Sequence, residues 1–166
     1  LSEIEQELSL AAGQPVVIAY PDTSFLCALY VPQSTSTAAI GHYQRMKESL
    51  HVSALLLYEF RQSVRFQIFR HGCDATQGFS KKTGLAALAE LQANLDAGAV
   101  VVLPADWADV IDLAERLSAQ HTAGAGHRAI DVLHVATALH LGAAEFLSFD
   151  ANQRKLAAAA GLTTEP

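Results

Sequence analysis

Residues 16–31 read VVIAYPDTSFLCALYV, an apolar segment in which Asp22 is the only acidic residue. The segment at residues 15–20 is apolar without a break, and this pattern is typical of a strand buried on both faces. The residues TSFLCALYV that follow favour a helix, with Asp22 at or near its N-cap. A fully buried strand that leads into a helix indicates a parallel sheet covered by helices.

The rest of the chain alternates in the same way between apolar strands and amphipathic or buried helices. Further strands are expected at residues 51–54, 99–104, 145–149 and 162–164. Helices are expected at residues 3–12, 23–31, 35–49, 55–70, 80–96, 107–120, 129–142 and 150–161. We therefore predict an α/β protein, a three-layer α/β/α sandwich with a mostly parallel central sheet of about five strands.

The length of 166 residues fits one domain, and 51% hydrophobic with 17% charged residues is the composition of a packed globular protein. We expect residues 1–14 to form an N-terminal helical extension and residues 15–166 to form the domain. No apolar run approaches the roughly 20 residues that span a bilayer, so no membrane association is expected. The acidic N-terminus does not resemble a secretory signal, and Cys27 and Cys73 lack metal-ligand spacing. We expect a cytoplasmic protein with reduced thiols.

Four carboxylates stand in segments where apolar residues would be less costly: Asp22, Glu59, Asp131 and Asp150. Two of them follow expected strands, one lies early in the helix after the second strand, and one lies in a helix that is apolar nearly all round. Ligands of open parallel sheets bind beyond the carboxyl ends of the strands, so we expect the four acids to meet there.

Each acid also has a structural interpretation that needs no ligand. Asp22 and Asp150 could be helix N-caps, a role that is compatible with metal binding. Glu59 could face solvent, and Asp131 could pair with Arg128.

Clustered carboxylates without a compensating base cannot all remain ionised unless a cation binds them. Mg²⁺ and Mn²⁺ prefer oxygen ligands, and such ions promote phosphodiester hydrolysis by polarising the phosphate and activating water. The pattern therefore predicts a Mg²⁺ or Mn²⁺ site for phosphoryl chemistry.

The formal net charge of −6 opposes nucleic-acid binding, but part of the negative charge belongs to the expected metal site. Basic residues that could follow a phosphate backbone flank the acids: Arg61, Arg65, Lys81, Lys82, Arg128 and Arg154. For any one of them, ordinary surface charge is the simpler explanation. Phe66 and Phe69 are expected in the core rather than as platforms for base stacking.

The segments YPDTSFLCAL, VSALLLYEF, AIDVLHVATAL and LSFDANQRKLAAAAGL resemble, in this order, the motifs of PIN-domain ribonucleases. The resemblance extends over about residues 16–164 and is strongest to the VapC-type toxins of bacterial toxin–antitoxin pairs. It implies that Asp22, Glu59, Asp131 and Asp150 are the catalytic and metal-binding acids.

By the same resemblance, the hydroxyls of Thr23, Ser24 and Ser148 support these acids. The implied activity is Mg²⁺- or Mn²⁺-dependent endonucleolytic cleavage of RNA by a metal-activated water. The implied partners are a cognate antitoxin and a second copy of the chain. The sequence departs from the family at Pro21, where an aliphatic residue is usual, and in the helix expected over residues 3–12.

His134 lies three residues after Asp131, a spacing at which the pair could bind a transition metal. We favour a hydrogen-bonded core histidine, because no second histidine lies at ligand spacing.

Three other functions compete with a toxin. One is an RNA-processing PIN nuclease without an antitoxin, and another is a catalytically inactive PIN-like binding module. A signalling receiver domain is the third, but it would need paired acids after the first strand and a lysine after the last.

Overall fold

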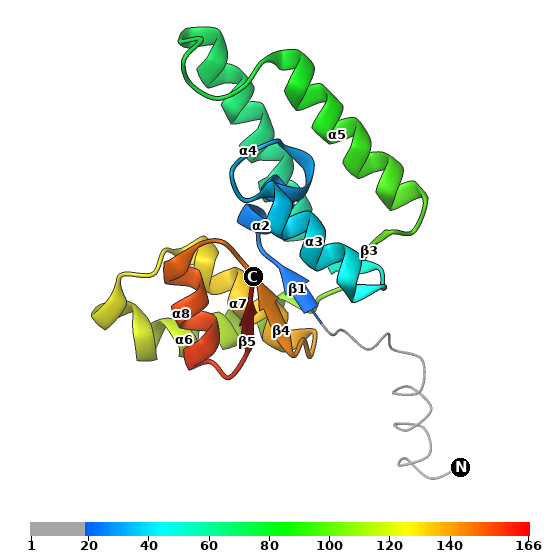
Figure 1. The fold of residues 1–166 in the computed structure, drawn as a ribbon. Coiled ribbons are helices and arrows are strands. Elements are labelled where there is room, and N and C mark those ends of the chain that lie inside the picture. Colours follow the sequence, from blue (N-terminus) through cyan, green and yellow to red (C-terminus); the bar gives the residue numbers. More distant parts are fainter. Residues whose placement is uncertain (1–18) are drawn as a thin grey trace.

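The computed structural model describes residues 19–166 (Figure 1). The helix expected at residues 3–12, and with it the N-terminal extension of residues 1–14, lies outside the described residues. The first expected strand is described only from Ala19 onward.

All strand pairs of the described chain are parallel. One sheet contains β1 (Ala19–Pro21), β4 (Glu145–Leu147) and β5 (Thr163–Glu165), and the other contains β2 (Leu50–Val52) and β3 (Val100–Val102). Because β1 and β2 also lie side by side, the five strands follow the order β3-β2-β1-β4-β5. The predicted α/β class with a parallel central sheet is confirmed.

Helices connect the strands, as the alternation in the sequence predicts. They are α2 (Thr23–Tyr30), α3 (Ser36–Met46), α4 (Ala54–Cys73), α5 (Lys81–Asp96), α6 (Trp107–Ala125), α7 (Ala129–His140) and α8 (Ala151–Ala159). Within residues 19–166, no helix is both long enough and apolar enough to cross a membrane.

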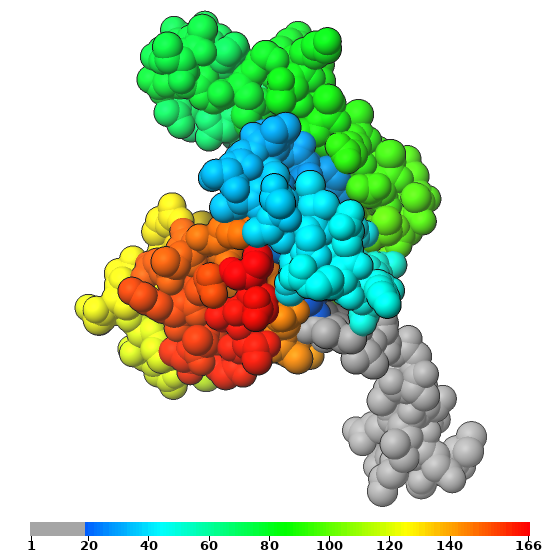
Figure 2. Space-filling view, viewed as in Figure 1, coloured from blue at the N-terminus to red at the C-terminus, as the bar shows by residue number. Residues whose placement is uncertain are grey.

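Helices α4 and α5 form an antiparallel arm that extends away from the rest of the protein, and Figure 2 shows the arm standing clear of the body formed by α6, α7 and α8. Gly84 permits their close approach, because a Cβ atom at this position would lie 2.4 Å from the Ile68 side chain. Arg61 Nη2 also donates to Gln92 Oε1 across the pair, at 3.3 Å.

Several large apolar side chains are exposed. Phe66 and Phe69 were expected to be buried, but they are 53% and 63% exposed on the outer side of α4, because α5 packs against only one face of this helix. Likewise, Trp107 and Ile111 share a face of α6 with buried Val110, yet they lie at its exposed edge.

The core extends along β1 and β4 and surrounds α7. Tyr20 and Phe146 are fully buried on these neighbouring strands, and their rings stack with centroids 6.3 Å apart. Helix α7 is buried along most of its length, including the polar residues Asp131 and His134. Burial of α7 therefore brings ionisable side chains into the interior, close to the ends of the strands.

Candidate active site

Asp22 follows the last residue of β1 and caps the N-terminus of α2. Its residue is 2% exposed. Oδ1 accepts hydrogen bonds from Phe25 N–H at 2.9 Å and Ser24 Oγ at 2.7 Å, and Oδ2 accepts one from Ser148 Oγ at 2.6 Å. The backbone N–H of Asp22 donates to the Leu147 carbonyl at 2.9 Å, which ties the site to β4. The interpretation of Asp22 as a helix cap is thus correct. The capping position places its carboxylate at the carboxyl ends of β1 and β4.

Burial raises the pKa of Asp22, whereas the hydrogen bonds from Ser148, Ser24 and Phe25 N–H oppose this rise. Ser24 and Ser148, which the resemblance marks as supporting residues, therefore contact this carboxylate directly. A cation near Asp22 would favour the ionised form of the carboxyl group, as these hydrogen-bond donors do.

Glu59 lies in the second turn of α4, and its side chain is 29% exposed. Its Oε2 atom accepts hydrogen bonds from Thr23 Oγ1 and from His134 Nε2, the latter at 2.5 Å. Burial raises the pKa of Glu59, but the hydrogen bonds from His134 and Thr23 outweigh burial and hold this pKa below its usual value. The side chain therefore faces polar partners in the interior rather than open solvent.

His134 connects Glu59 to a buried chain of hydrogen bonds. Its residue is 1% exposed, and Nδ1 lies 3.4 Å from Tyr20 Oη. Tyr20 Oη lies 2.7 Å from Ser53 Oγ, which accepts from Leu56 N–H at 3.2 Å. Because the ionised carboxylate can only accept, Nε2 of His134 carries the hydrogen. The structure thus contains the hydrogen-bonded core histidine favoured from the sequence.

Asp131 lies in the first turn of α7 and is 4% exposed. Arg128 contacts it with two nitrogen atoms, Nε at 2.8 Å from Oδ2 and Nη2 at 3.1 Å from Oδ1. Gln153 Nε2 from α8 donates to the same Oδ1 atom at 3.1 Å. The expectation that no positively charged side chain balances these acids is therefore wrong, because Arg128 forms an ion pair with Asp131.

Asp150 caps the N-terminus of α8, as its cap interpretation proposed. Its Oδ1 atom accepts from the N–H groups of Asn152 and Gln153 at 2.8 and 3.0 Å. Its Oδ2 atom lies 3.8 Å from Arg128 Nη2, and its own N–H donates to Ser148 Oγ at 2.9 Å.

Short polar links connect the four acids. Ser148 Oγ contacts both the carboxylate of Asp22 and the backbone N–H of Asp150. Arg128 contacts the carboxylates of both Asp131 and Asp150. Thr23, the residue next to Asp22, contacts Glu59. The structure therefore brings the four predicted acids into one neighbourhood beyond the ends of β1 and β4.

Sequence reasoning missed Gln153 as a member of this neighbourhood. It stands three residues after the N-cap Asp150, the spacing of a capping box in which its side chain would bond the N–H of the cap. Ser148 accepts that N–H instead, and Gln153 donates to Asp131. The capping-box spacing was the available signal, but it predicts a different partner.

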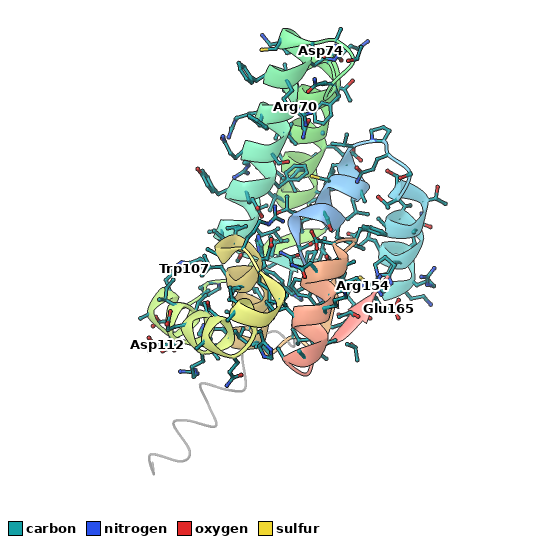
Figure 3. The ribbon with its side chains drawn as sticks, turned by 90° about the vertical axis from the view of Figure 1, so that its left-hand side faces the viewer. Arg70, Asp74, Trp107, Asp112, Arg154 and Glu165 are labelled. Atoms are coloured by element: carbon teal, nitrogen blue, oxygen red, sulfur yellow. The ribbon has the colours of Figure 1, made fainter. Side chains whose placement is uncertain are left out.

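The remaining predicted basic residues lie farther along the surface. Arg61 and Arg65 belong to α4, and Lys81 and Lys82 begin α5, so these four lie on the arm. Arg154 on α8 donates to the carbonyl of Pro166 at 2.8 Å, and Figure 3 shows it beside the last strand.

The oxygen atoms of the site suit a hard divalent ion, since they belong to carboxylate and hydroxyl groups. However, no three His, Cys, Asp or Glu side chains within residues 19–166 are arranged as a preformed metal site. The carboxylates are instead directed toward the N–H and O–H groups of the protein that donate hydrogen bonds to them. To bind a metal ion, the four acids would have to give up some of these hydrogen bonds.

Comparison with known families gives a clear assignment. A family model described as the PIN domain matches residues 19–159, which is most of the chain. The chain belongs to the PIN domain family. The resemblance noted in the sequence is therefore confirmed at the level of the family. A search of curated proteins found no match.

Solved structures share the PIN fold at low sequence identity. Mycobacterium tuberculosis VapC20, described as a toxin that cleaves the sarcin–ricin loop, is 19% identical, with a TM-score of 0.63 over 89% of this chain and 99% of that one. FitAcB from Neisseria gonorrhoeae is 16% identical, with a TM-score of 0.59 over 90% and 97% of the two chains. VapBC2 from Rickettsia felis, solved with a promoter DNA fragment, is 12% identical, with a TM-score of 0.61 over 90% and 98%.

Proposed function

We propose that this PIN domain is a Mg²⁺- or Mn²⁺-dependent endoribonuclease and the toxin of a toxin–antitoxin pair. The observation that carries the nuclease proposal is the gathering of Asp22, Glu59, Asp131 and Asp150 beyond the carboxyl ends of β1 and β4. Ligands of open parallel sheets bind at these ends, and clustered carboxylates suit a hard divalent ion.

In this proposal the four acids hold the metal ion, directly or through water. A divalent ion held there would supply Lewis acidity toward an RNA phosphodiester and a more nucleophilic water. The chain itself orients the ligands: Ser24 and Ser148 fix the two oxygens of Asp22, and Thr23 with His134 fixes Glu59. Such outer contacts keep carboxylates in position and typically affect metal affinity when removed.

The partners form the second part of the proposal. A cognate antitoxin is proposed because structures with the same fold include VapBC2 of Rickettsia felis, solved with a promoter DNA fragment. We also propose an RNA substrate, a homodimer and a cytoplasmic location. The basic residues proposed to contact RNA are Arg61, Arg65, Lys81, Lys82, Arg128 and Arg154.

The test is cleavage of a fluorescently labelled single-stranded RNA with Mn²⁺ or with a chelator. We expect cleavage by the wild type with Mn²⁺ only, and a loss of at least about 100-fold in Asp22→Asn and Asp131→Asn. Asp112→Asn, an equal charge change at an exposed position of α6 that Figure 3 labels, should cleave like the wild type.

Two results would redirect the proposal. A folded wild type that binds Mn²⁺ but cleaves no RNA would favour an inactive binding module. Cleavage that persists in both site variants would remove the four acids from the mechanism. Co-purification of a small protein encoded beside the gene, with cleavage suppressed in the complex, distinguishes a toxin from an RNA-processing nuclease.

A further inference from the structure

Arg128 forms ion pairs with two of the four acids, Asp131 and Asp150. Its guanidinium makes two contacts with Asp131, at 2.8 and 3.1 Å, and approaches Asp150 Oδ2 at 3.8 Å. Among residues 19–166, the ion pairs with Asp or Glu otherwise involve only histidines, His42 with Glu145 and His134 with Glu59. One arginine thus supplies the fixed positive charge of the site.

We propose that Arg128 is an internal counter-cation that competes with the divalent ion for Asp131 and Asp150, and so sets the metal affinity of the site. This inference rests on the proposed function, because it requires that these acids bind metal. Both Asp131 oxygens already accept from Arg128, and a metal ion bound by either oxygen competes with the guanidinium for the same negative charge.

The two partners differ in their freedom to separate. The Arg128 side chain is 72% exposed, it stands at the N-cap of α7, and it makes no capping hydrogen bond. Asp131 is 4% exposed and is also held by Gln153 Nε2 at 3.1 Å. Arg128 can therefore move into solvent, while Asp131 stays directed into the site.

A displaced Arg128 would remain next to the site at the start of α7. Its planar guanidinium can contact a phosphate with two N–H groups, as it contacts Asp131. The same residue would then neutralise the carboxylates before the metal ion binds and contact the RNA backbone afterwards.

Calorimetric titration with MnCl₂ tests the competition. We expect Arg128→Gln to bind Mn²⁺ about two- to fivefold more tightly than the wild type, the range expected for loss of a partly exposed ion pair. The matched control is Arg116→Gln, which removes the same charge from an exposed position of α6, and it should bind like the wild type. With a chelator present, Arg128→Gln should melt at a lower temperature than the wild type, and excess Mn²⁺ should reduce this difference.

Equal or weaker Mn²⁺ binding by Arg128→Gln would overturn the inference while leaving the metal site intact. Absence of Mn²⁺ binding by both the wild type and Arg128→Gln would instead overturn the metal site itself, and the inference with it. Should the glutamine variant fail to fold, Arg128→Met replaces it, because methionine keeps an unbranched side chain but has neither the positive charge nor the two-nitrogen contact. Tighter binding by the methionine variant would then support the competition, and unchanged or weaker binding would refute it.

Discussion

His134 Nε2 lies 2.5 Å from Glu59 Oε2, although the two residues are 75 positions apart in the chain. The contact joins the buried helix α7 to the first part of α4. His134 is packed against Tyr20, with ring centroids 6.3 Å apart, so its imidazole presents a hydrogen-bond donor from a fixed position in the core. Glu59 is thereby held at the edge of the site rather than free in solvent.

Replacing His134 tests whether this donor supports the site. Leucine removes the N–H, whereas glutamine can present an amide N–H at a similar distance along the side chain. We expect His134→Leu to reduce Mn²⁺-dependent RNA cleavage by at least about tenfold, as is usual for partners that orient metal ligands. His134→Gln should retain more activity than His134→Leu. Equal activity of the leucine variant and the wild type would show that the contact does not serve the site.

Ser148 should contribute measurably to stability, because its hydroxyl contacts the buried carboxylate of Asp22 and the half-buried backbone N–H of Asp150 at once. It donates to Asp22 Oδ2 at 2.6 Å and accepts from Asp150 N–H at 2.9 Å. Ser148→Ala leaves both without this partner, which should lower the free energy of unfolding by about 1–3 kcal/mol in urea denaturation. Ser118→Ala, at a half-buried position of α6, provides the comparison and should change stability by less.

The pH dependence of stability should carry a contribution from Glu59. Its pKa in the folded protein is below the usual value, so its stabilising effect is present above about pH 4.3 and is lost as the pH falls through and below that value. With a chelator present, the stability difference between the wild type and Glu59→Gln should therefore shrink between about pH 6 and pH 3. Asp22, whose pKa is raised, acts in the opposite sense but is common to both proteins.

A difference that stays constant or grows as the pH falls would contradict this assignment. It would mean that Glu59 gains nothing from His134 and Thr23 in its ionised form.

The two cysteines should react at very different rates. Burial raises the pKa of Cys27 to about 11, whereas Cys73 is exposed at the end of α4. Because the thiolate is the reactive form, a thiol-specific disulfide reagent at about pH 8 should modify one thiol rapidly in the native protein and a second only after unfolding. Rapid modification of Cys27 in the native Cys73→Ser variant would show that the α2 region opens readily.

The sequence was most informative where a residue stood out against its neighbours. Asp22 and Asp150 follow apolar strands, and Asp131 interrupts an apolar helix, so their proximity followed from parallel topology. The pairing of Arg128 with Asp131 was available as a three-residue spacing, but a local pattern does not tell whether such a pair forms.

Other features depend on tertiary packing and could not be read from a local pattern. The contact between His134 and Glu59 requires α7 and α4 to meet, and periodicity carries no information on that. Phe66 and Phe69 look like core residues in a helix, yet α5 packs on the other side of α4 and leaves them exposed. Gln153 stands at the spacing of a capping box, but its side chain donates a hydrogen bond to Asp131 instead.

The position of Mn²⁺ in crystals of the protein can be located by its anomalous scattering, and it tests the metal centre directly. We expect an anomalous peak beyond the ends of β1 and β4, beside a carboxylate oxygen of Asp22 or Asp131, and its loss in Asp22→Asn. A strong Mn²⁺ peak elsewhere in the molecule, with none among Asp22, Glu59, Asp131 and Asp150 at saturating Mn²⁺, would show that these acids do not form a metal centre.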